Sequence, residues 1–144
     1  MICRVLVALD ESARAPSVFR AAEAQALAFR AELLVLRVVF PPPEFPPAAA
    51  SAPHDQLARQ MADDARRELL GYIRQSAVAR SSVLVANQGT ARDNILNTAR
   101  DHQVDLLVMG SHGYRGLEHL FGTLTESIAD AARCNVLIVH GNEA

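Results

Sequence analysis

The sequence predicts an α/β domain in which a doubly wound, five-stranded parallel sheet carries helices on both faces. Five short apolar runs rich in Val, Leu and Ile lack polar alternation, which is typical of strands covered on both sides. The segments between these runs have helical periodicity, so the expected order is βαβαβαβαβ. Because a parallel neighbour can be reached only by a crossover, this alternation favours a parallel sheet.

Each apolar run is expected to be one buried strand. The runs are short, as buried strands are, and turn-forming or polar residues bound them. They are CRVLVALD at 3–10, ELLVLRVV at 32–39, SVLVAN at 82–87, DLLVMG at 105–110 and NVLIVH at 135–140.

Four helices are expected between the strands. The first places Val18, Ala22 and Ala26 on one face, and the third begins near Asp93. The second carries charged residues at 63–68, which are expected on its solvent-exposed face. The apolar stripe of the second helix is Leu57, Met61, Ala65, Leu69 and Ile73, and that of the fourth is Leu117, Leu120, Leu124 and Ile128.

The stretch FPPPEFPPAAASAP, residues 40–53, contains six of the seven prolines. Proline-rich sequence cannot continue a strand or a helix, so we interpret this stretch as a flexible loop. It is either a plain spacer or a lid over the end of the second strand.

Length and composition indicate one domain over residues 1–144. No run approaches the roughly 20 apolar residues that a membrane-spanning helix requires. The start MICRVLVALDE lacks the regions of a secretory signal. We therefore expect a cytoplasmic protein with no membrane partner, in which Cys3 and Cys134 are buried thiols.

Charge excludes several classes of protein. The net charge of −2 comes from 14 basic and 16 acidic residues with no basic stripe, so nucleic acid is not an expected partner. Every basic residue is arginine, which excludes Schiff-base chemistry and the phosphate-binding lysine of a P-loop. The histidines and cysteines lack metal-binding spacing, so no metal site is expected, and His112 and His119 are interpreted as surface or loop residues.

The segment VMGSHGYRGLEHLFGTLTES, residues 108–127, is the part of the chain that we expect to bind a ligand. Glycine admits positive φ and lets backbone N–H groups approach an anion, and a helix N-terminus adds favourable charge. Phosphate is the expected ligand, and Arg115 either contacts it or is exposed to solvent. Glycines also serve merely to turn a chain, and Thr123 is equally suited to cap the last helix together with Glu126.

The whole chain resembles the universal stress protein family. The similar segments are VALDES, VLRVVF, GTARDNI, LLVMGSHG, YRGLEHLF, GTLTE and CNVLIV. The pattern G-x2-G-x9-G-[ST] of ATP-binding members is similar to Gly110, Gly113, Gly122 and Thr123, with one departure: eight residues separate Gly113 from Gly122. The resemblance implies the strand order 3-2-1-4-5 of the adenine nucleotide alpha hydrolase-like fold.

The resemblance also implies ATP, ADP or AMP as the ligand, with Mg²⁺ accompanying ATP through its phosphates. Asp10 would lie at the carboxyl end of the first strand, where open α/β sheets bind ligands. Its alternative role is the N-cap of the first helix, for which Ser12 is an equal candidate. The apolar members of the set would be ordinary strand residues in any protein of this fold. The implied nucleotide contacts are Ala8, Leu9, Asp10, Val38, Met109, Gly110, Gly113, Gly122, Thr123, Leu124 and Thr125.

The function implied is that of a regulatory, stress-response homodimer. The last strand, 135–140, has an apolar edge that carries no charge to discourage pairing with a second copy, unless a loop of the same chain covers it. A nucleotide-free dimeric interaction module and a slow ATPase are the alternatives. For the ATPase, the motif offers no convincing general base or arginine finger beyond Asp10, His112 and Arg115, so no catalytic residue is assigned.

Overall fold

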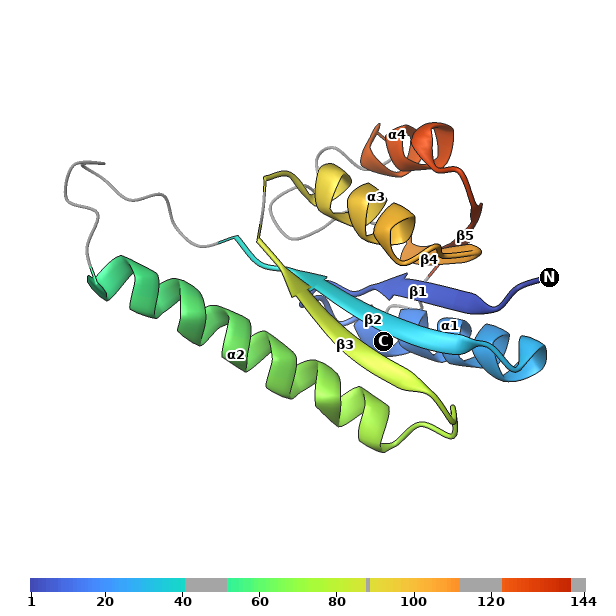
Figure 1. Cartoon of the computed structure of the whole chain (residues 1–144), viewed down its shortest axis with the longest axis horizontal. Coiled ribbons are helices and arrows are strands. Elements are labelled where there is room, and N and C mark those ends of the chain that lie inside the picture. The colour runs from blue at the N-terminus through green and yellow to red at the C-terminus, as the bar shows by residue number, and fades with distance from the viewer. Residues whose placement is uncertain (41–51, 88, 112–122, 141–144) are drawn as a thin grey trace.

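The computed structural model describes residues 1–40, 52–87, 89–111 and 123–140. Strands and helices alternate along these ranges as the sequence predicts (Figure 1). The elements are β1 (Arg4–Ala8), α1 (Ala15–Phe29), β2 (Glu32–Val38), α2 (Ala52–Arg74), β3 (Ser81–Ala86), α3 (Ala91–Asp101), β4 (Leu106–Gly110), α4 (Thr123–Ala131) and β5 (Asn135–Val139). Each predicted apolar run contains its strand, except that β3 begins one residue early.

The strands form one parallel sheet in the order β3-β2-β1-β4-β5, which confirms the predicted fold class. In the centre of the sheet, Val7 of β1 lies beside Val35 of β2 and Val108 of β4. These three side chains are fully buried, as expected where both faces of a sheet are covered.

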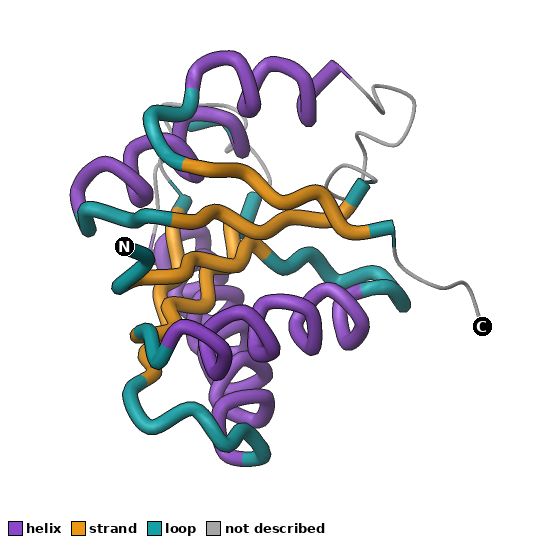
Figure 2. Tube along the Cα trace, turned by 90° about the vertical axis from the view of Figure 1, so that its right-hand side faces the viewer, coloured by secondary structure: helices purple, strands orange, loops and turns teal. Residues whose placement is uncertain are grey.

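Alternate strand residues supply two separate cores. Val7 and Leu33 belong to the core beneath α1 and α2, whereas Leu34 and Leu107 belong to the core beneath α3 and α4. Figure 2 shows this arrangement as helices above and below the strands. Because side chains on a strand alternate between faces, apolar runs without polar alternation supply both cores.

Two element boundaries differ from the predictions. α3 begins at Ala91 and not near Asp93, because the hydroxyl of Thr90 caps the helix by accepting a hydrogen bond from the N–H of Asp93 at 3.0 Å. The predicted loop at 40–53 extends two residues too far, since α2 begins at Ala52. Its stretch at 41–51 lies outside the described residues.

The prediction of two buried thiols is wrong. Cys3 is exposed because it precedes β1 at the amino edge of the sheet, and Cys134 is partly buried. Burial raises the pKa of the Cys134 thiol. Within the described ranges, no helix is both long and apolar enough to span a membrane.

The amino edge of the sheet is held by charged side chains. Arg4 pairs with Glu32 at 3.1 Å and donates to the carbonyl of His102 at 2.9 Å. Asp105 accepts hydrogen bonds from the N–H groups of Cys3 and Arg4, and these bonds lower the pKa of its carboxyl group. Polar contacts at this edge therefore tie β1 to β2 and β4, opposite the edge where a ligand would bind.

Candidate functional site

β1 and β4 form the topological switch point of the sheet. From β1 the chain crosses to β2 on one side, whereas β4 lies on the other side. Connections that leave these strands diverge at the carboxyl edge, and open α/β sheets bind ligands in the crevice formed there. Asp10 follows β1 and Ser111 follows β4, so both lie at this edge.

Four predicted contact residues meet on the face of the sheet that α3 and α4 cover. Ala8 of β1 lies beside Met109 of β4 in the parallel register. Both residues, together with Val38 of β2, belong to the core on this face, and Leu124 of α4 packs against it. Leu9 differs, because its side chain belongs to the opposite core and is 1% exposed. Residues from four elements thus converge beneath the carboxyl edge.

Asp10 shapes the turn after β1 and does not cap α1. Its Oδ1 accepts a hydrogen bond from the N–H of Ser12 at 2.9 Å, and the Ser12 hydroxyl accepts one from the N–H of Arg14 at 3.2 Å. α1 begins at Ala15 with Arg14 as N-cap and without a side-chain capping bond. The alternative N-cap roles of Asp10 and Ser12 are therefore wrong.

The glycine-rich segment is described only at its ends. Gly110 ends β4 beside Val139 of β5, and the N–H of Ser111 donates to the carbonyl of Val139 at 2.8 Å. Ser111 is buried directly after the strand. The predictions that lie outside the described residues are those on His112, Gly113, Arg115, Leu117, His119, Leu120 and Gly122.

The first turn of α4 contains a buried hydroxyl. α4 begins at Thr123, whose side chain is not described, so its phosphate-binding or capping role stays a prediction. Oγ1 of Thr125 is buried and has no hydrogen-bond partner among the described residues. Leaving such a group unsatisfied costs about 1–3 kcal/mol. The N–H groups of a first helical turn also lack partners within the helix, so both kinds of group can serve a ligand.

Arg37 of β2 is the site residue that the sequence analysis missed. Its side chain is only 2% exposed, and its Nε donates to the carbonyl of Leu9 at 2.7 Å. Nη2 donates to the carbonyl of Asp10 at 3.1 Å, and Nη1 and Nη2 each reach a carboxylate oxygen of Glu68 at 3.3 Å. The signal was a charged residue inside an apolar run, because a buried charge has to be paired.

A pocket of about 490 Å³ opens where β2 ends against α2. This volume falls within the range of about 300–1,000 Å³ that is usual for small-molecule sites. The predicted residues Asp10 and Val38 line it together with Arg37, and α2 adds Asp64 and Glu68. Because the carboxylates outnumber the guanidinium, this pocket favours hydrogen-bond donors over phosphate groups.

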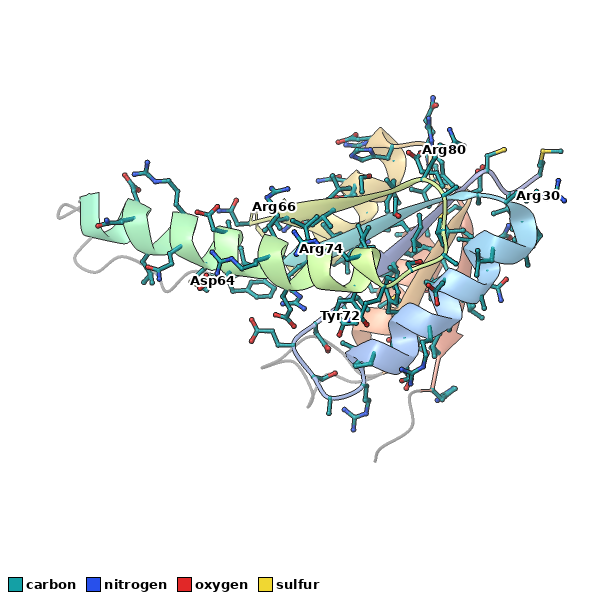
Figure 3. All side chains as sticks on the ribbon, turned by 90° about the horizontal axis from the view of Figure 1, so that it is seen from below. Arg30, Asp64, Arg66, Tyr72, Arg74 and Arg80 are labelled. Atoms are coloured by element: carbon teal, nitrogen blue, oxygen red, sulfur yellow. The ribbon has the colours of Figure 1, made fainter. Side chains whose placement is uncertain are left out.

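Tyr72 anchors α2 next to this pocket, and Figure 3 shows it on the side of α2 that faces α1. Its ring centroid lies 4.9 Å from that of Phe19 of α1. Burial raises the pKa of the Tyr72 hydroxyl, and the nearby Glu68 carboxylate raises it further. Because Glu68 lies one helical turn from Tyr72, the aromatic contact fixes the part of α2 that carries Glu68.

No group of three His, Cys, Asp or Glu side chains suited to a metal ion occurs in the part of the chain that the structure describes.

The sequence model of the Universal stress protein family matches residues 1–140. A relative named "Universal stress protein in QAH/OAS sulfhydrylase 3'region", from Thermus aquaticus, is 32% identical over 142 residues, covering 96% of this chain and 99% of the relative.

Solved structures share the fold. The universal stress protein UspA from Lactobacillus plantarum superposes with a TM-score of 0.78 at 25% identity, covering 96% of this chain and 98% of that one. A universal stress protein in complex with cAMP superposes with a TM-score of 0.68 at 23% identity, covering 96% and 97% of the two chains.

Proposed function

This chain belongs to the universal stress protein family, and from that membership we propose that it binds an adenine nucleotide at the carboxyl edge of β1, β2 and β4. The observation that carries the proposal is the convergence of Ala8, Val38, Met109 and Leu124, which come from four elements, on one face of the sheet. This convergence lies at the switch point, where such sheets bind ligands. The related protein in complex with cAMP supports adenine as the base.

The chemistry of the two sides of the edge orients the nucleotide. The carboxylate of Asp10 accepts hydrogen bonds from ribose hydroxyls, and Val38 and Met109 pack against the base. The phosphates lie toward α4, away from the carboxylates of the β2 pocket, and Mg²⁺ accompanies ATP through those phosphates. The phosphate contacts proposed are Gly110, Gly113, Gly122, Thr123 and Thr125.

The nucleotide serves a regulatory role in a stress response, carried out by a cytoplasmic homodimer with one domain over residues 1–144. The family match over 1–140 supports the single domain. A nucleotide regulates a protein only if it binds two conformations unequally, so its effect falls on the surface presented to a partner. ATP turnover is not part of the proposal, because no catalytic residue is assigned.

Mass spectrometry of the protein purified under native conditions tests this function. The expected result is a copurified adenine nucleotide, one per chain, that is released on unfolding. Protein that carries none, and that binds none of ATP, ADP or AMP at millimolar concentration, would instead be the nucleotide-free interaction module.

The homodimer is proposed to form through β5. This strand ends the sheet, and Asn135 donates its N–H to the carbonyl of Asp105, while the carbonyl of Val139 accepts from Ser111. Because successive residues of a strand present their backbone groups to opposite sides, Val136 and Ile138 direct theirs away from β4. An apolar edge of this kind recruits a second copy across a twofold axis.

Replacing Ile138 with proline is expected to weaken self-association by about tenfold, because one edge N–H is lost in each copy. The backbone bonds to β4 are retained but the Ile138 side chain, which packs against the core, is lost, so circular dichroism checks that the monomer remains folded. Sedimentation equilibrium measures the dissociation constant, and Leu137→Pro is the control that removes an inward N–H and lowers stability instead. A dimer of unchanged affinity in Ile138→Pro would show that another surface pairs the copies.

A further inference from the structure

The guanidinium of Arg37 joins three segments that are distant in the sequence. It belongs to β2, two of its donors reach the carbonyls of Leu9 and Asp10 after β1, and two bonds reach Glu68 of α2. Its side chain lies on the α1 and α2 face, since Arg37 alternates with Leu36 and Val38 of the opposite core. One planar group thus connects β2, the turn after β1 and α2.

The contacts of Arg37 fix the direction of the turn that carries Asp10. The carbonyls of Leu9 and Asp10 are held by donors of one rigid guanidinium, so neither of the two peptide planes that flank Asp10 can rotate freely. On its other side Asp10 is held by the hydrogen bond from the N–H of Ser12. Arg37 therefore holds the backbone from which the Asp10 carboxylate projects, and the N–H of Ser12 holds the carboxylate itself.

The carboxylate of Glu68 offsets the free-energy cost of burying the charge of Arg37. The Glu68 side chain is 52% exposed while it pairs with Arg37, and Glu11 contributes a second carboxylate at 4.0 Å. A buried guanidinium without such partners would be strongly destabilising. These contacts therefore link the position of α2 to the turn after β1. A contact between side chains of neighbouring strands alone would not make this link.

We propose that Arg37 is a positioning residue for the nucleotide site, which holds Asp10 in the orientation that binds the ribose and makes nucleotide affinity depend on the pairing with α2. This inference rests on the proposed function for its effect on affinity. Arg37 itself acts through Asp10 and contacts no nucleotide atom.

Arg4 provides a matched control at the opposite edge of the sheet. It also pairs with a glutamate, Glu32 at 3.1 Å, and donates to a backbone carbonyl, that of His102 at 2.9 Å. Arg4→Met and Arg37→Met remove the same charge, although the Arg4 side chain is 43% exposed and that of Arg37 only 2%. A loss of affinity confined to Arg37→Met would therefore show that the change in net charge is not its cause.

Titration calorimetry with ATP is the first measurement. Arg37→Met is expected to bind ATP about tenfold more weakly than the parent protein, and Arg4→Met to bind it equally well. In an Asp10→Ala background the effect of Arg37→Met is expected to vanish, because residues that act through one another are not additive. Additive losses would show a merely structural role and overturn the inference. Glu68→Gln, which keeps both carbonyl contacts, is expected to weaken binding by about threefold and replaces Arg37→Met if that variant fails to fold.

Hydrogen exchange without nucleotide is the second measurement. The N–H of Ser12, which donates to Asp10, is expected to exchange about tenfold faster in Arg37→Met and unchanged in Arg4→Met. Unchanged exchange in Arg37→Met would overturn the inference even if ATP binds. Faster exchange in a protein that binds no nucleotide would leave the positioning role intact and overturn the proposed function alone.

Discussion

Asp10→Ala is expected to weaken ATP binding by about a hundredfold while leaving the fold intact. A hydrogen bond to a charged group contributes about 1.5–3 kcal/mol, and a ribose offers two hydroxyl donors to one carboxylate. Asp10 does not cap α1, so its removal does not take away the start of that helix. Titration calorimetry measures the dissociation constant, and circular dichroism checks the fold.

Two further variants separate charge from turn geometry. Asp10→Asn retains an acceptor for the N–H of Ser12 and is expected to lose about tenfold in affinity, because only the charge is removed. Asp101→Ala changes the net charge equally but acts at the end of α3, on an exposed side chain, and is expected to bind ATP normally. Equal losses of ATP affinity in Asp10→Ala and Asp101→Ala would show that the overall charge, and not the site, causes the effect.

Thr125→Val is expected to change stability and affinity in opposite directions. In the nucleotide-free protein it replaces a buried hydroxyl without a described partner by a methyl group of similar shape, so the free energy of unfolding rises by about 1 kcal/mol. In the complex the same change removes a donor to phosphate, so affinity for ATP falls by at least about tenfold. Denaturant unfolding and calorimetry measure the two effects.

Thr125→Ser is the control because it keeps the hydroxyl and removes only a methyl group. It is expected to lose some stability through packing and to retain the affinity for ATP. A Thr125→Val protein that is less stable and binds ATP as well as the parent would show that the hydroxyl serves the packing of α4 and not a ligand.

The fold could be predicted because its signals are local. The runs at 3–10, 32–39 and 105–110 are rich in Val and Leu and lack polar alternation, which is typical of strands covered on both faces. The sequence predicts the start of α3 near Asp93, two residues too late, because the capping residue is Thr90. A capping residue is recognised by one hydrogen bond, and several nearby polar residues could have formed it.

The charged part of the site could not be predicted, because it depends on how distant elements pack. The prediction that Glu68 lies on the solvent-exposed face of α2 is confirmed, but periodicity does not reveal its pairing with Arg37, 31 residues earlier. Helical periodicity predicts which residues share one face of a helix. It does not predict which strand residue that face contacts. Conversely, the resemblance to the universal stress protein family implied both Val38 and Met109, and the two residues belong to the same core.

Calorimetric titration of the protein with ATP, and with adenosine in parallel, tests the nucleotide site most directly. We predict one ATP bound per chain, adenosine bound at least about tenfold more weakly because it lacks phosphates, and stabilisation by about 2.7 kcal/mol at a free ATP concentration 100 times the dissociation constant. The absence of both heat and thermal stabilisation at millimolar ATP would contradict a nucleotide site at the carboxyl edge of this sheet.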